Sequence, residues 1–165
     1  MRSALDRSGD PVEALELTNR ILVDERRTGL FVTMLAGVLE LDTGRFTFAN
    51  AGHEMPLLVP GDGSESRWVE GSGPLVGMFG RLDLTAETVT IQPGDRLILY
   101  TDGITDAASP AGARLGIEPF RVLASGTHAG HAEDTCRTVI DSVLAFQGDA
   151  EAADDLALLV LRRVP

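Results

Sequence analysis

The sequence contains very little cysteine: Cys136 is the single thiol among 165 residues. One thiol cannot build an internal disulfide framework or a thiolate zinc cluster, and such a composition is typical of a cytoplasmic protein. Cys136 lies in a stretch with helical periodicity, where a buried structural thiol is more common than a nucleophile. We therefore expect a cytoplasmic chain in which Cys136 carries no chemistry.

Long hydrophobic runs and basic residues are also scarce. No apolar run reaches the roughly 18 residues of a membrane-spanning helix, and the first residues lack the apolar core of a signal peptide. Lys and Arg number 14 against 25 Asp and Glu, which gives a formal net charge of -11. Nucleic acid and anionic membranes need clustered positive charge, so we expect no nucleic-acid partner and no membrane insertion. The acidic excess fits either ordinary solubility or carboxylates that hold a cation.

Apolar residues make up 44% of the chain, which is enough for one hydrophobic core. We therefore expect a single domain over residues 1–165. Asp10 followed by Pro11 predicts a helix start, because Asp caps free amide groups and Pro tolerates the first helical position. The helix should end near residues 24–27, and residues 1–7 read as the tail of an earlier helix.

The apolar stripe of the helix that starts at Pro11 is predicted to consist of Val12, Leu15, Ile21 and Leu22. Apolar, β-favouring segments separated by turn residues then predict strands at 31–41, 45–49, 55–59, 68–69, 87–91, 96–100 and 156–161. Helices are expected over 117–124 and 132–146. Strands that come first and helices that follow, without regular alternation, predict an α+β domain dominated by antiparallel sheet.

Carboxylates stand at the ends of two apolar strands, although Asp is a poor strand residue and costly to bury without a partner. The strand at 96–100 runs into Asp102, a glycine permits a tight turn beside it, and Asp106 lies four residues further on. Asp154 and Asp155 stand directly before the final strand. If the two strands are sheet neighbours, Asp102 and Asp154 meet at one edge of the sheet.

Two interpretations of these aspartates compete. Close carboxylates repel one another unless a cation lies between them, and hard oxygen ligands suit magnesium or manganese. Alternatively, Asp102 caps its turn and Asp154 caps the start of its strand, with no ion bound. Composition alone leaves both interpretations open.

Five segments occur in the order and approximate spacing of a known family: Phe31–Leu35, Ala49–His53, Gly73–Gly77, Gly94–Asp106 and Asp154–Leu159. In these segments the sequence resembles the family that includes the sporulation phosphatase SpoIIE and the sigma-factor regulator RsbU. That family belongs to the metal-dependent protein phosphatases related to protein phosphatase 2C. A single Asp-Gly pair is common, but five motifs in register across nearly the whole chain are hard to obtain by chance.

The resemblance implies a β-sandwich flanked by helices, with two manganese or magnesium ions that bridge a water attacking phosphoserine or phosphothreonine. By motif match, Asp102 is the ligand of the Asp-Gly motif, with Gly103 beside it, and Asp154 is the ligand that opens the last strand. Asp106 matches an acidic position that helps to hold a third, looser ion in parts of the superfamily. Asp155 falls where relatives carry Asn or Asp and is assigned to the surroundings of the site.

His53 follows a glycine at an expected strand end, where the wider superfamily places a metal-binding acid. It could bind a metal or transfer a proton, but a role in holding its loop by hydrogen bonds is the more common one. The glycines of segment 71–80 would permit movement near the active site of relatives, although an ordinary surface loop explains them equally.

Family members begin this domain with a Gly-Asp segment whose Asp bridges both metal ions, and the sequence contains no such segment. Gly9-Asp10-Pro11 matches it only superficially, because it lies at a helix cap and lacks the glycines that follow. We expect an N-terminally incomplete domain that represents the C-terminal two-thirds of the catalytic unit. Absent strands would leave open sheet edges, so we also expect a homodimer.

The leading hypothesis is a Mn- or Mg-dependent protein serine/threonine phosphatase of bacterial signalling. Its expected substrate is a phosphorylated protein, namely an anti-sigma-factor antagonist. The alternative is a catalytically inactive phosphatase-like module that binds such a partner. A third and weaker hypothesis is an unrelated α+β domain with incidental acidic turns and no affinity for metal.

Overall fold

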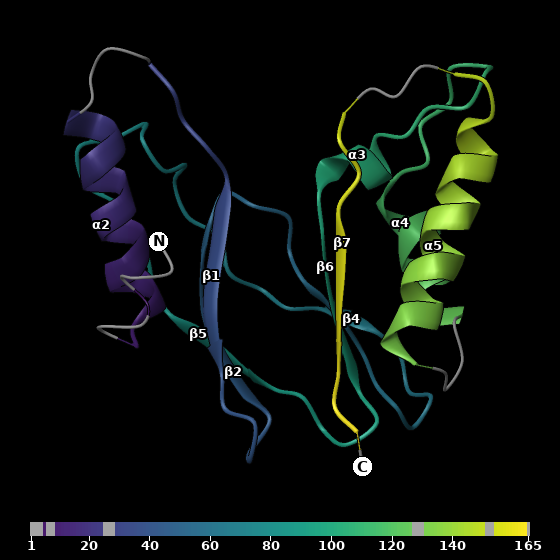
Figure 1. Cartoon of the computed structure of the whole chain (residues 1–165), viewed down its shortest axis with the longest axis horizontal. Helices are drawn as coiled ribbons and strands as arrows, with labels where there is room; N and C mark the ends of the chain where they lie inside the picture. Colours follow the sequence, from purple (N-terminus) through teal and green to yellow (C-terminus); the bar gives the residue numbers. More distant parts are fainter. Residues whose placement is uncertain (1–4, 6–8, 25–28, 127–130, 151–153, 165) are drawn as a thin grey trace. The chain divides into compact units, whose positions relative to one another are not determined.

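The computed structural model describes residues 5, 9–24, 29–126, 131–150 and 154–164. The chain divides into two compact units. The first comprises residues 1–55 and 69–90, and the second comprises residues 56–68 and 91–165. Each unit contains one antiparallel sheet together with helices (Figure 1). The mixed helix and antiparallel-sheet composition confirms the α+β prediction.

Among the described residues, the first unit contains helix α2 and three strands that pair in one sheet. Its sheet has the order β1-β2-β5, with β1 at Met34–Leu39, β2 at Arg45–Ala51 and β5 at Glu87–Thr90. Helix α2 spans Pro11–Asp24, and it starts where the sequence predicts. The Asp10 carboxylate accepts a hydrogen bond of 2.8 Å from the amide of Val12, so Asp10 caps the helix as expected.

Helix α2 and the sheet form the core of this unit. Leu15 is fully buried, and it clusters with Ala36, Ala49, Ala51, Val76 and Leu82. Val12 and Leu22 pack partly against this cluster. Ile21 is 50% exposed, so its predicted place in the apolar stripe is wrong. The buried side chain of Asn19 links α2 to the segment around Gly77. Its nitrogen donates a hydrogen bond to the carbonyl of Phe79, and its oxygen accepts one from the backbone amide of Gly77.

The described part of the second unit contains four strands and three helices. Its sheet has the order β4-β3-β6-β7, with β3 at Leu57–Val59, β4 at Arg67–Trp68, β6 at Arg96–Tyr100 and β7 at Leu158–Arg162. The helices are α3 at Asp102–Thr105, α4 at Ile117–Gly126 and α5 at Ala132–Gln147. Although only a short turn separates β5 from β6, the two strands join different sheets. The predicted strand at 156–161 begins two residues later, at Leu158.

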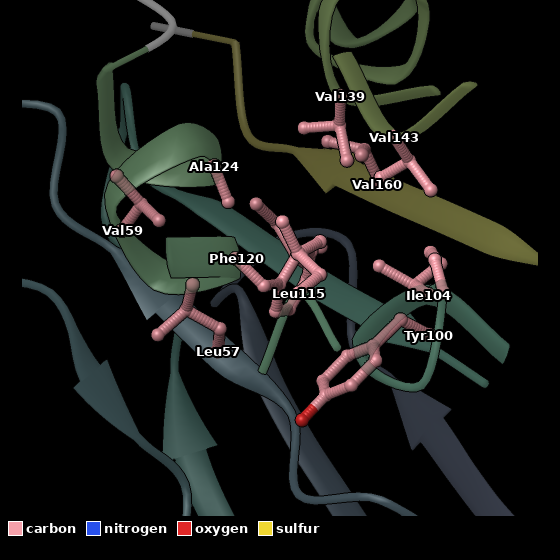
Figure 2. Close-up of a cluster of buried hydrophobic side chains, with 12 residues drawn as sticks. Leu57, Val59, Tyr100, Ile104, Leu115, Phe120, Ala124, Val139, Val143 and Val160 are labelled. Carbon is pink, nitrogen blue, oxygen red and sulfur yellow. The ribbon is translucent and has the colours of Figure 1, made fainter. Parts of the chain in front are cut away.

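Helices α4 and α5 and the strands of this sheet bury one apolar cluster, shown in Figure 2. Phe120, Val139, Val143 and Ile98 are fully buried in it. The ring of Phe120 lies 4.3 Å from that of Tyr100 and 6.4 Å from that of Trp68, measured between centroids. Contacts at these separations add to the stabilisation from buried area alone. The cluster therefore anchors β6, the strand that leads to Asp102.

The single cysteine has the structural surroundings that the sequence predicts. Cys136 lies half-buried on α5 and packs against the apolar cluster, where burial raises the pKa of its thiol. A raised pKa disfavours the thiolate, which agrees with a structural role.

Within the described residues, no helix combines the length and the apolar character needed to cross a bilayer.

Phe120→Ala should lower the free energy of unfolding by about 3–5 kcal/mol, because the side chain is fully buried and its loss leaves a cavity. Val122 on the same helix is 64% exposed, so Val122→Ala should cost no more than about 0.5 kcal/mol. Urea unfolding followed by the fluorescence of Trp68, the only tryptophan, measures both changes. Equal losses in the two variants would contradict the burial of Phe120.

Candidate metal site at the end of strands β6 and β7

Strands β6 and β7 are adjacent and antiparallel, and they pair from Arg96 opposite Arg162 to Tyr100 opposite Leu158. The chain that leaves β6 therefore lies beside the chain that enters β7 (Figure 1). Asp102 follows β6, and Asp154 precedes β7. The sequence left the pairing of these two strands as a condition, and the structure meets it. The pairing carries the two aspartate segments to the same end of the strand pair.

Thr101 ties the two segments together beyond the last strand pair. Its amide donates to the carbonyl of Ala157 at 3.1 Å. Its hydroxyl donates to the carbonyl of Asp155 at 2.9 Å and accepts from the amide of Ala157 at 2.9 Å. Asp102 is the next residue after this clamp, so its backbone position is set against that of Asp155. Sequence reasoning missed Thr101, although a hydroxyl residue between a strand and a tight turn is a common backbone clamp.

Gly103 packs directly against the second aspartate segment. A Cβ atom at this position would lie 2.4 Å from the carbonyl oxygen of Asp155 and 3.4 Å from the carbonyl carbon of Asp154. Because real Cβ contacts are not that short, only glycine fits without a shift of the backbone. The glycine of the Asp-Gly pair thus permits the close approach of the two segments.

The aspartates of this end differ in their surroundings. Asp102, Asp154 and Asp155 are exposed. One carboxylate oxygen of Asp154 accepts the amide of Asp155 at 2.7 Å. The amide of Asp106 donates to the carbonyl of Asp102 at 2.8 Å, so the turn after β6 does continue into helical geometry as α3. The carboxylate of Asp106 accepts from the guanidinium of Arg114, also at 2.8 Å.

The described part of the chain contains no group of three or more His, Cys, Asp or Glu residues placed to hold a metal ion. Exposed carboxylates supply the hard oxygen ligands that manganese and magnesium prefer. The donors at the end of β6 and β7 therefore fit such an ion chemically, as part of a ligand set.

His53 lies in the first unit, whereas the aspartates lie in the second. The side chain of buried Asn50 holds its backbone: the amide of His53 donates to Asn50 at 2.8 Å, and Asn50 donates to the carbonyl of His53 at 2.9 Å. The Nδ1 atom of His53 lies 3.2 Å from the hydroxyl of Thr33. His53 thus has the loop-holding contacts that the sequence left as one alternative. The Asn-x-Gly pattern is a turn signal that could have singled out Asn50.

Segment 71–80 is held at several points. Val76 forms two backbone hydrogen bonds with Val32, and Gly77 and Phe79 are bound by Asn19. A Cβ atom on Gly77 would lie 2.6 Å from the carbonyl oxygen of Leu30. Glycine is therefore required here by close backbone approach as well as by the positive φ of 89°.

Gly103→Ala should lower the free energy of unfolding by about 1–3 kcal/mol, because the added methyl group displaces the backbone at Asp155. Gly126 lies at the end of α4, and among the described residues no atom beyond its own helix backbone and chain neighbours lies within 4 Å of the position of a Cβ atom, so Gly126→Ala should be neutral or stabilising. Thermal unfolding of both variants measures the difference. A Gly103→Ala variant as stable as Gly126→Ala would show that the two segments do not approach each other this closely.

Comparison with known sequences places the chain in a family. It matches the family model described as Stage II sporulation protein E (SpoIIE) over residues 1–164. Phosphoserine phosphatase RsbU of Bacillus subtilis is 27% identical over 153 residues, which cover 93% of this chain and 45% of RsbU. The chain thus spans less than half the length of that relative.

Solved structures show the same fold. The SiaA-PP2C domain of Pseudomonas aeruginosa has a TM-score of 0.79 at 22% identity, covering 98% of this chain and 64% of that one. The RsbU and RsbW domains of Rv1364c from Mycobacterium tuberculosis give 0.74 at 30% identity, with coverages of 99% and 45%. Structural neighbours also include the SpoIIE phosphatase domain presoaked with manganese and RsbX in complex with magnesium. The chain belongs to the SpoIIE family and has the fold of PP2C phosphatase domains.

Proposed function

We propose that this chain forms part of the catalytic domain of a protein phosphatase that uses manganese or magnesium to hydrolyse phosphoserine or phosphothreonine. The observation that carries the proposal is the pairing of β6 with β7, which brings the segments of Asp102 and Asp154 to one end of the sheet. Membership of the SpoIIE family and similarity to RsbU, a named phosphoserine phosphatase, support the same activity.

In this proposal Asp102 and Asp154 are metal ligands, and two ions are expected in the complete domain. Bound metal lowers the pKa of a coordinated water and neutralises phosphate charge. Thr101 and Gly103 hold the backbone of both aspartate segments in place. Asp155 supports the site next to Asp154.

Asp106 has a further role in the proposal as a ligand of a looser ion. Its carboxylate is bound to Arg114, whose side chain is 69% exposed. An exposed ion pair is worth only about 0–1 kcal/mol, so a divalent cation can compete with the guanidinium for Asp106. An ion that binds Asp106 must therefore displace the guanidinium group of Arg114.

We further propose that the substrate is a phosphorylated protein of a partner-switching pathway, namely an anti-sigma-factor antagonist. The similarity to RsbU, and to a structure that contains RsbU and RsbW domains, supports this choice. A second candidate function is a phosphatase-like module that binds such a protein without hydrolysis. It is favoured by one observation: the described residues form no group of three metal-binding side chains.

Calorimetric titration with manganese tests the aspartate site directly. The chain should bind Mn²⁺, and Asp102→Asn should abolish binding because a charged ligand is lost. Asp141→Asn is the matched control, since Asp141 is an exposed aspartate on α5. Equal binding by Asp102→Asn and Asp141→Asn would contradict the assignment of Asp102.

Turnover of p-nitrophenyl phosphate in the same samples separates the two candidate functions. Manganese-dependent turnover that is lost in Asp102→Asn supports the enzyme. Manganese binding with turnover no higher than that of Asp102→Asn favours the binding module.

Arg114→Gln should raise the affinity for manganese by about two- to fivefold, because it removes the cation that occupies Asp106. Arg137→Gln removes an exposed arginine that is paired with Glu133 on α5, and it should leave the affinity unchanged. Unchanged affinity in Arg114→Gln would exclude Asp106 from the ion site. The titration is performed at low salt, where exposed charges are least screened.

A further inference from the structure

The second unit contains a basic cavity in an otherwise acidic chain. The sequence has no lysine, so its 14 basic residues are all arginines. Three of them, Arg96, Arg121 and Arg162, line one cavity of about 430 Å³. They come from β6, α4 and β7, respectively. The chain as a whole has a net charge of -11, so a cavity lined by three arginines differs in charge from the protein average.

Arg96 and Arg162 lie directly opposite each other across the paired strands. Like charges in that position destabilise a sheet. Arg96 is only 7% exposed, and burial, together with repulsion from Arg162, lowers the pKa of its guanidinium. One nitrogen of Arg96 donates to the hydroxyl of Thr135 at 3.0 Å, which orients the side chain. The two arginines therefore project from neighbouring strand positions into one cavity, where an anion would reduce their mutual repulsion.

The charge of Arg162 is available to a ligand. Among the described residues, no carboxylate lies within ion-pair distance of Arg162. Arg121 is paired with Glu118 at 2.9 Å and more loosely with Glu65 at 3.5 Å. Glu65 also lines the cavity, but its side chain is 86% exposed, and an exposed ion pair is worth only about 0–1 kcal/mol, so an anion can replace it at Arg121.

Hydroxyl groups and apolar side chains complete the lining. Ser66 and Ser125 share a hydrogen bond of 2.8 Å, and Ser64 also lines the cavity. Val59 and Val122 give the cavity apolar surface. Arginine forks and hydroxyl donors around an apolar wall are the groups that recognise a phosphate attached to a small organic molecule. The volume lies in the range of small-molecule sites.

We infer that this cavity is a binding site for a small phosphate-bearing molecule. A phosphate group offers oxygens to several guanidinium groups at once, whereas a carboxylate has only two oxygens for the many donors present.

The cavity is separate from the aspartate site. Arg96 begins β6 and Arg162 ends β7, whereas Asp102 and Asp154 lie beyond the opposite ends of these strands. Along β6, the step from Arg96 to Tyr100 is four residues, which corresponds to about 14 Å of strand between the arginine end and the aspartate end.

Calorimetry with AMP and, separately, with inorganic phosphate tests this site in a phosphate-free buffer that contains EDTA. EDTA removes divalent metal, so the aspartates contribute nothing to binding. The full chain should bind AMP, and Arg162→Gln should weaken binding at least about tenfold through loss of charged hydrogen bonds. Arg137→Gln, which changes an exposed arginine of α5 outside the cavity, should bind like the unmodified chain.

Binding of both probes, or of AMP alone, with loss in Arg162→Gln supports the site; the two cases separate recognition of the phosphate from recognition of the whole molecule. No binding of either probe, or equal binding by Arg162→Gln and Arg137→Gln, overturns it. Arg121→Gln provides a second variant if Arg162→Gln does not fold. Asp102→Asn should bind AMP normally, so failure of the phosphatase proposal would leave this result unaffected.

Discussion

The antiparallel pairing of β6 with β7 is the interaction on which the rest of the second unit depends. It places the backbone after Tyr100 against the backbone before Leu158. The Thr101 hydroxyl then extends the contact by two hydrogen bonds beyond the strands. This pairing holds two short acidic segments, which are far apart in the sequence, at the same end of the sheet although their like charges repel each other. The buried cluster around Phe120 stabilises the pair, because it covers β6 and β7 together (Figure 2).

The same strand pair carries opposite charges at its two ends. Asp102, Asp154 and Asp155 gather at one end, and Arg96 and Arg162 face each other at the other. The net charge of the chain does not reveal this arrangement, because it sums the aspartates and the arginines without regard to their positions. Since neighbouring strands run antiparallel, the residue that ends one strand lies beside the residue that starts the next. A single pairing therefore creates both an end suited to a divalent cation and an end suited to an anion.

Much of this could be predicted from the sequence, and the remainder depends on tertiary contacts. The start of α2 at Pro11 follows from local capping chemistry. The pairing of β6 with β7 could be stated from the sequence only as a condition, because an apolar run shows a strand but not its neighbour in the sheet. The partner of Asp106 could not be predicted, because Arg114 reaches it through the fold of the loop after α3. The buried position of Arg96 could not be predicted either, because its hydrogen-bond partner Thr135 lies far along the sequence, on α5. Ile21 was misplaced because an apolar residue on a helix need not face its core.

Paramagnetic broadening by manganese in a ¹⁵N-labelled sample tests the central claim most directly. Mn²⁺ broadens amide signals according to their distance from the ion, so it reports where the ion lies. Binding at the end of β6 and β7 should broaden the amides of Gly103 and Asp155 at substoichiometric manganese, before those of Gly94 and Arg163 at the other end of the strand pair. Equal broadening at both ends, or broadening centred away from Asp102, would contradict the account.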